Sequence, residues 1–254
     1  EIDPVSPMAL VYSNRIATGL AVLQAQSLDF ELHALAVWNG QPGDNDGGTA
    51  SVMAEWEHRQ LKPHVISLVP RDAAGMGPDA PPPPAAAAES ASATVGPGIH
   101  HEIKALVFVD VINHQKVAER QMPLFIREFK GEIARLLAAR AARPTVSESW
   151  GRSQQFIYDS LQEAANFALE FRELVMRTDW AQRGLPADLG VRIVLHAGPV
   201  YAYVDPVLQR ITCAGSHLAR AARIEPITPA GQIYVTQEFA ALCDEKVNPA
   251  VKSF

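Results

Sequence analysis

The chain has 254 residues, 48% of them hydrophobic, and a formal net charge of −6. This length can supply one large or two small hydrophobic cores. The mild acidity argues against non-specific nucleic-acid binding, which requires a basic surface. No apolar run approaches the roughly 20 residues that span a bilayer, so we expect no membrane segment.

The N-terminus lacks the basic start and apolar region of a signal peptide, and it lacks a Met. We therefore expect the chain to be a piece of something longer. The two cysteines, Cys213 and Cys243, fit neither a metal-ligand spacing nor a structural disulfide. A reducing, cytoplasmic location is the expectation that follows.

Residues 8–70 show the alternating pattern of a parallel α/β unit. The predicted elements are a helix capped by Ser13 and ending near Gln26, a buried strand over 31–38, a helix from Thr49 or Ser51 to Arg59, and a strand over 64–69. This order is typical of a doubly wound sheet, and two strands correspond to part of a Rossmann-like domain. The glycine-rich loop 39–48 can cradle a phosphate before a helix, or it can be a plain connector.

Residues 71–101 interrupt this pattern. Pro81–Pro84 and Ala85–Ala88 lie among further Gly, Ser and Ala residues, a composition that cannot bury a core. The segment is predicted to be a linker, which divides the chain into a unit over 1–70, the linker, and a second unit over 102–254.

The second unit contains both helix and strand patterns. The predicted strands cover 103–110, 145–150, 154–158, 191–196, 201–204, 210–213 and 233–236, with turns at 151–152 and 197–199. The predicted helices begin at Pro123, at Ser160 with a capping box to Glu163, at Ser216 and at Gln237. The apolar face of the first helix comprises Ile126, Phe129, Ile133, Leu136 and Leu137.

Five motifs in residues 102–243 occur in a recognisable order. They are LVFVDV at 106–111, WG at 150–151 with FIY at 156–158, VRIVLHAGPV at 191–200, GSHLARAARIE at 215–225, and PAGQIYV at 229–235. Together they resemble the class III nucleotidyl cyclase catalytic domain, which has a ferredoxin-like α+β fold. Residues 178–180, 205–206 and 220–229 resemble a bacterial multidomain subgroup, and residues 8–70 resemble the module upstream of its cyclase domain.

The resemblance implies a fold that continues beyond Phe254, so we expect the chain to be truncated at both ends. It also implies the conversion of a nucleoside triphosphate, GTP or ATP, into a 3′,5′-cyclic nucleotide and pyrophosphate with Mg²⁺ or Mn²⁺. Two aspartates hold the metal ions in this family. Asp110 matches the first, with the Val111 carbonyl beside it; the alternative is an aspartate that merely caps a strand end.

Arg152 stands at the position of the second aspartate. A guanidinium neither binds a metal ion nor loses its proton near neutral pH, so we expect it to pair with Asp110 and to weaken or abolish catalysis. One alternative is that Arg152 binds the triphosphate directly in place of one ion. Another is a sequence error over 152–155, because this stretch is oddly polar for a strand that faces a core.

Three further positions match functional residues of the family. Glu148 matches the base-reading position, where glutamate accompanies guanine and lysine accompanies adenine, and Thr212 matches its partner; a solvent-facing strand residue is the alternative for Glu148. Arg223 matches the arginine that stabilises charge at the α-phosphate, or it is a helix-surface residue. Ala219 replaces the usual ribose-binding asparagine.

The family forms its site between two chains, which implies a homodimer or a heterodimer with another cyclase domain. The sequence thus supports two hypotheses, a bacterial signalling cyclase weakened by Arg152, and an inactive homology domain that binds nucleotide or pairs with an active partner. Neither involves nucleic acid or a membrane. His196 is expected to make a structural hydrogen bond and to have no catalytic role.

Overall fold

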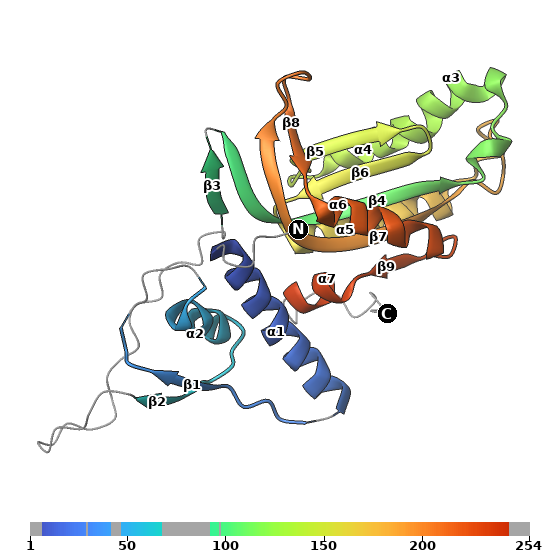
Figure 1. The fold of residues 1–254 in the computed structure, drawn as a ribbon. Helices are drawn as coiled ribbons and strands as arrows, with labels where there is room; N and C mark the ends of the chain where they lie inside the picture. Colours follow the sequence, from blue (N-terminus) through green and yellow to red (C-terminus); the bar gives the residue numbers. More distant parts are fainter. Residues whose placement is uncertain (1–6, 29, 42–46, 68–91, 97, 244–254) are drawn as a thin grey trace, which may run out of the picture. The chain divides into compact units, whose positions relative to one another are not determined.

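The computed structural model describes residues 7–28, 30–41, 47–67, 92–96 and 98–243. Contacts within the chain divide it into two compact units, Glu1–Ile103 and Lys104–Phe254, which we describe separately (Figure 1). The mixture of helices and sheets agrees with the α/β and α+β classes predicted from the sequence. The division at residues 70 and 101 stays a prediction.

The N-terminal unit contains a short parallel sheet. Its elements are α1 (Pro7–Leu28), β1 (Leu35–Trp38), α2 (Thr49–His58) and β2 (His64–Ser67). Strands β1 and β2 pair in parallel, with Leu35 opposite His64, and α2 is the crossover between them, as the alternating pattern predicts.

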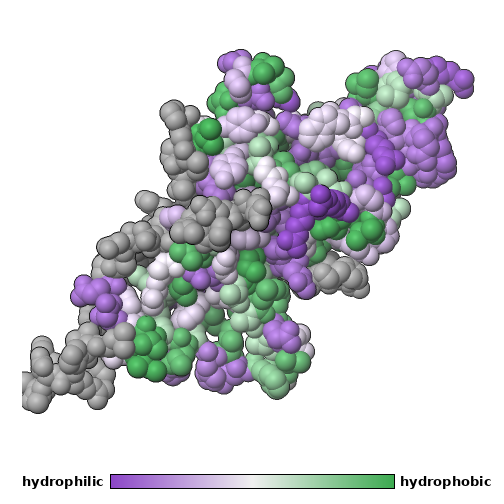
Figure 2. Space-filling model, in the orientation of Figure 1, coloured by the Kyte–Doolittle hydropathy of each residue, from purple (hydrophilic) through white to green (hydrophobic). Residues whose placement is uncertain are grey.

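Two predictions for this unit are wrong. Ser13 lies exposed inside α1 and does not cap it, because the helix begins six residues earlier, at Pro7. Strand β1 is shorter than 31–38 and is not buried on both faces, since Leu35 is 61% exposed and Val37 is 53% exposed. Figure 2 shows hydrophobic residues at the surface of this part of the chain.

The glycine-rich loop is described only at its two ends, because residues 42–46 lie outside the described ranges. Gly47 has a φ of +90°, and a Cβ on this residue would lie 2.7 Å from the Cβ of Leu10. Its carbonyl also accepts a hydrogen bond of 2.7 Å from the Asn14 side chain on α1. Close packing against α1 therefore accounts for glycine at this position.

Most of the predicted linker, residues 71–91 and 97, lies outside the described ranges. Its last part is not a linker but a strand, β3 (Ser92–Gly96), which pairs antiparallel with the start of β4 (Ile99–Ile112). Strand β4 is thus longer than the predicted 103–110.

The second unit is built on a sheet with the order β5-β6-β4-β7-β8. The strands are β5 (Val146–Trp150), β6 (Ser153–Tyr158), β7 (Gly190–Val204), β8 (Ile211–Ala214) and β9 (Ile233–Val235), which pairs in parallel with β7. The predicted β5–β6 hairpin is confirmed, with Gly151 at a φ of +56° in its turn. The polar stretch 153–155 fits this hairpin, because Gln154 and Gln155 are buried in a strand paired in register with β4.

Helices cover the two faces of this sheet unequally. One face packs against α3 (Met122–Leu124), α4 (Gly131–Ala139), α5 (Leu161–Arg177) and α7 (Gln237–Leu242) in the larger core cluster. The other face packs against α6 (Ser216–Ile224) in a smaller cluster. Short 3₁₀ turns cover His114–Lys116, Glu119–Gln121 and Glu225–Ile227.

Strand alternation decides which residues of β4 meet which face. The odd-numbered residues 105–111 point into the larger core, and Leu106 and Phe108 point toward the smaller cluster. Asp110 therefore shares the face of α6. The same alternation on β7 sends Val191, Ile193 and Leu195 into the larger core and leaves Arg192 and His196 on the face of α6.

The predicted helix from Pro123 is confirmed, but its buried face differs. Residues Phe125–Lys130 form a π-helical segment between α3 and α4. Its wider turn places Phe125 and Phe129 in the core with stacked rings 4.9 Å apart, and leaves Ile126 55% exposed. The assignment of Ile126 to the buried face is therefore wrong.

The predicted turn at 197–199 is also wrong, because β7 continues without a break to Val204. Gly198 allows a close contact between β7 and α6, and it does not form a turn. A Cβ on Gly198 would lie 2.2 Å from the His217 Nδ1 on α6, so only glycine admits the helix at this distance. The Ser160 cap of α5 is confirmed, since its side chain accepts a hydrogen bond from the Glu163 backbone at 3.3 Å.

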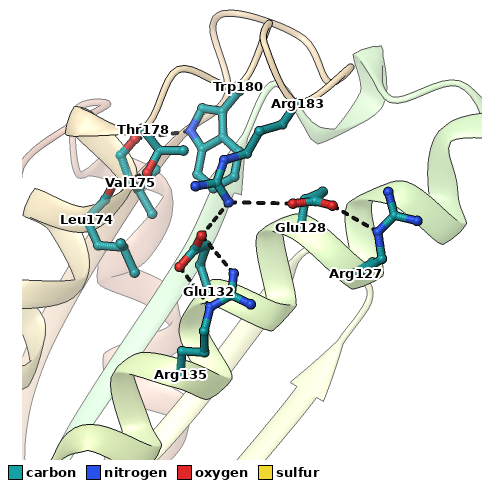
Figure 3. Close-up of polar contacts among 9 residues, drawn as sticks. All are labelled: Arg127, Glu128, Glu132, Arg135, Leu174, Val175, Thr178, Trp180 and Arg183. Atoms are coloured by element: carbon teal, nitrogen blue, oxygen red, sulfur yellow. Dashed lines mark hydrogen bonds and ion pairs between the residues drawn. The ribbon is translucent and has the colours of Figure 1, made fainter.

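A polar network fixes the helix of residues 122–139 to the segment that follows α5 (Figure 3). Arg183 pairs with Glu132 and, at 3.6 Å, with Glu128. Its guanidinium lies 5.7 Å from the ring centroid of Trp180, which is buried and donates to the Val175 carbonyl at 3.1 Å. These contacts hold the helix of residues 122–139 and the segment after α5 together over the larger core.

Candidate active site

Asp110 lies near the end of β4, on the face of the sheet that α6 covers. Its side chain is only 1% exposed. Opposite it in the ladder is Ser153, directly after the hairpin turn, and the Val111 backbone donates to the Arg152 carbonyl at 3.1 Å. Strand pairing thus fixes Asp110, Val111 and Arg152 side by side.

The expected ion pair between Asp110 and Arg152 is present. The Arg152 Nε lies 2.8 Å from the Asp110 Oδ1, and the Arg152 side chain is 54% exposed. The guanidinium therefore lies over a buried carboxylate and reaches solvent on its other side.

A second guanidinium holds the same carboxylate. Arg192 on β7 donates to the Asp110 Oδ2 from its Nε at 3.1 Å and from its Nη2 at 2.8 Å. Its Nη1 donates to the Pro226 carbonyl at 2.9 Å, and its Nε lies 2.6 Å from the Glu225 Oε1. Asp110, Arg152, Arg192 and Glu225 form one unit, which we call the guanidinium–carboxylate cluster.

The cluster contains two carboxylates and two guanidiniums, and all of its side chains except that of Arg152 are largely buried. Burial, and then the neighbouring Asp110 carboxylate, raise the pKa of Glu225 above its ordinary value. Arg192 and Glu225 were not predicted as site residues, although a charged residue inside the apolar strand 191–196 is a signal for a buried ion pair.

The two predicted base-reading residues come together on the described chain. The end of β7 and β8 fold back so that β8 approaches β5 (Figure 1). The Thr212 hydroxyl donates to the Glu148 Oε1 at 3.2 Å, and Arg210 lies 3.4 Å from the same oxygen. The Glu148 side chain is 12% exposed, so the solvent-facing alternative does not describe it.

Arg223 lies on α6, one turn beyond Ala219, and both residues are exposed. Arg223 makes no ion pair with any residue of the described ranges. It therefore does not pair with the guanidinium–carboxylate cluster, although Glu225 lies only two positions later.

The arrangement of sheet, hairpin and α6 falls within one stretch of sequence. Residues 100–251 match the profile of the adenylate and guanylate cyclase catalytic domain. The chain belongs to this family. No curated protein sequence matches it significantly.

Solved structures of cyclase domains are also similar. The guanylate cyclase domain of RhGC from Catenaria anguillulae in complex with GTP is 20% identical with a TM-score of 0.49, over 57% of this chain and 83% of that one. The adenylyl cyclase CyaB from P. aeruginosa is 17% identical with a TM-score of 0.48, over 57% of this chain and 81% of that one.

Cyclase domains use divalent metal ions, but the residues present here do not fit such an ion. A metal site needs carboxylate oxygens that are free to coordinate. In this cyclase domain one oxygen of Asp110 lies against Arg152 and the other accepts from Arg192. Across the described ranges, no three His, Cys, Asp or Glu side chains are grouped so that they could hold a metal ion.

The cyclase domain also contains a buried histidine pair. The His196 Nε2 lies 2.8 Å from the His217 Nδ1, and the His196 Nδ1 lies 2.9 Å from the Thr236 hydroxyl. This confirms the structural hydrogen bond expected of His196, whereas His217 was missed. Burial, and then the proximity of His217, lower the pKa of His196 to about 4.

Within the described part of the chain, no helix is both long and apolar enough to cross a membrane.

Proposed function

We propose that this cyclase domain binds a purine nucleoside triphosphate, prefers guanine, and cyclises it weakly or not at all. The observation that carries the proposal is the contact between Glu148 and Thr212. Their roles come from the motif resemblance, and their proximity in space supports those roles.

Guanine recognition rests on the chemistry of Glu148. A carboxylate accepts hydrogen bonds from the N1 and N2 donors of guanine, whereas adenine presents an acceptor at N1. Thr212 can donate or accept and therefore discriminates less. The bond between the Thr212 hydroxyl and the Glu148 Oε1 holds the carboxylate in one orientation before a base arrives.

The triphosphate would lie between two chains. Arg223 is exposed and has no described ion-pair partner, which suits a residue that acts on a ligand shared with another protomer. We propose a homodimer, or a heterodimer with a second cyclase domain, in bacterial cytoplasmic signalling. Asp110 and Arg152 of one protomer would then face Arg223 of the other.

Weak turnover follows from the guanidinium–carboxylate cluster. Cyclisation requires the 3′-hydroxyl to lose a proton as it attacks the α-phosphorus, and divalent ions usually supply the stabilising charge. Asp110 is committed to two guanidiniums, and Ala219 cannot orient a ribose. A slow cyclase remains the second candidate, because Glu148, Thr212 and Arg223 are all retained.

Product analysis tests the proposal. The purified chain is incubated with manganese and separately with GTP, ATP, CTP or UTP, and any cyclic nucleotide is identified by mass. Arg152→Asp is compared under identical conditions, with Arg177→Asp as a charge-matched control on the exposed end of α5. We expect little product from the natural chain, and cyclic GMP from Arg152→Asp.

Efficient cyclisation by the natural chain would contradict weak turnover and support the working cyclase. Equal product from ATP and GTP would contradict the guanine preference. If neither chain forms product, nucleotide binding measured by fluorescence decides between a binding module and no nucleotide function.

A further inference from the structure

We infer that the guanidinium–carboxylate cluster takes the place of the divalent ions, so that this chain binds the triphosphate group without metal through the Arg152 guanidinium. The inference rests on the proposed nucleotide binding. It adds which group of the protein neutralises the charge of the triphosphate.

The cluster already neutralises its own carboxylates. Asp110 and Glu225 bring two negative charges, and Arg152 and Arg192 bring two positive charges. A divalent cation at Asp110 would have to displace Arg192, which is also held by Glu225 and by the Pro226 carbonyl. Displacement would break the two bonds from Arg192 to the buried Asp110 carboxylate, which is unfavourable.

The cluster is layered so that positive charge faces outward. The carboxylate of Asp110 is almost completely buried, and the Glu225 and Arg192 side chains are only 14% and 17% exposed. Arg152 is the one member whose side chain is more than half exposed. A ligand that approaches this face of the cluster therefore meets a guanidinium, which attracts an anion and repels a cation.

Arg152 keeps suitable donors for phosphate. Its Nε lies 2.8 Å from the Asp110 Oδ1, and its two terminal nitrogens make no hydrogen bond with the described residues. These nitrogens form the planar fork that matches two phosphate oxygens at once. The backbone bond from Val111 to the Arg152 carbonyl and the turn at Gly151 hold this residue in place.

Binding of N-methylanthraniloyl-GTP tests the inference, because fluorescence reports binding without catalysis. The full chain is titrated in EDTA and, separately, in manganese, together with Arg152→Ala, Arg152→Lys and the surface control Arg177→Ala. We expect the same dissociation constant in both buffers, within about threefold. Arg152→Ala should weaken binding in EDTA by at least about tenfold, and Arg152→Lys by less, because lysine keeps the charge without the fork.

Binding that appears only in manganese would overturn the inference and leave the proposed nucleotide binding intact. Undiminished binding by Arg152→Ala in EDTA would overturn the role of Arg152. Absence of binding in both buffers would instead refute the proposed function itself.

Direct metal binding gives an independent readout. The electron paramagnetic resonance of Mn²⁺ is recorded with the natural chain and with Arg152→Asp, both without nucleotide. We expect more bound Mn²⁺ with Arg152→Asp, since two acidic side chains then adjoin on β4 and the hairpin. Tight Mn²⁺ binding by the natural chain would mean that the cluster does not exclude the ion, and the inference would fall.

Discussion

The Thr212 hydroxyl donates a hydrogen bond to the Glu148 carboxylate at 3.2 Å, although the two residues lie 64 positions apart in the sequence. Strands β5 and β8 come at opposite ends of the sheet order, and the fold-back of β7 and β8 closes the distance between them. The two residues proposed to read the base therefore meet within one chain.

Replacing Glu148 with lysine should reverse the base preference. The ammonium group donates where the carboxylate accepts, so it suits the adenine N1 and repels the guanine N1 and N2 donors. We expect the affinity ratio of GTP to ATP to fall by at least about tenfold, measured by competition against the fluorescent nucleotide. Glu148→Gln keeps an acceptor oxygen and should change the ratio less; an equal change in both variants would argue that only charge matters.

The histidine pair predicts an acid-sensitive stability. His196 has a folded-state pKa of about 4, below the ordinary 6.5, so the unfolded chain binds more protons between these two values. The free energy of unfolding should therefore fall as the pH drops through this window, by about 3 kcal/mol in total, and this contribution should be constant above pH 6.5.

Urea unfolding at several pH values checks this expectation. The groups that face His196 are His217 on α6, Thr236, and Glu238, which is 4.0 Å away and paired with Arg220. His196→Asn removes the titrating ring and should flatten the pH dependence relative to the natural chain. A parallel decline in both chains would assign the acid sensitivity to other residues.

The contact between Gly198 and His217 predicts a destabilising substitution with a specific rescue. Gly198→Ala places a methyl group 2.2 Å from the present position of the His217 Nδ1, and should cost about 1–3 kcal/mol of unfolding free energy. Adding His217→Thr removes the ring, so the double variant should recover much of the loss. Additive losses in the double variant would show that the ring is not the obstacle.

Trp180 and Trp150 form a matched pair for testing the packing of the outer layer. Trp180 is buried, donates to the Val175 carbonyl and lies 5.0 Å from the Phe129 ring centroid, whereas Trp150 is exposed. We expect Trp180→Ala to lower the unfolding free energy by about 3–5 kcal/mol, and Trp150→Ala by well under 1 kcal/mol, in urea titrations. Similar losses would contradict this account of the network in Figure 3.

Local sequence patterns predicted which helices and strands form better than they predicted the residues at which these elements begin and end. The β5–β6 hairpin, α5 with its Ser160 cap, and α6 follow from glycine, capping and helical spacing, which act within a few residues. The prediction of a turn at 197–199 was wrong because Gly198 makes room for His217 on α6, a helix that begins 18 positions later. A pattern of neighbouring residues does not contain this contact. Ile126 failed because a π-helical segment shifts the buried face.

The residues of the candidate site were likewise predicted only in part. Motif order predicted Asp110, Arg152, Glu148 and Thr212, and the ion pair between Asp110 and Arg152 followed from their chemistry. Arg192 lies 82 positions from Asp110, on another strand, and only the alternation of β7 brings it to the face of α6. The hydrogen bonds from Arg192 to Asp110 could not be predicted without knowing which strands are neighbours in the sheet.

The backbone of the hairpin turn is held independently of the Arg152 side chain. Strand pairing and the bond from the Val111 nitrogen to the Arg152 carbonyl set its course, and the side chain projects from the surface end of the turn. A substitution at this position therefore leaves the course of the backbone unchanged, but it removes the ion pair that covers the buried Asp110 carboxylate.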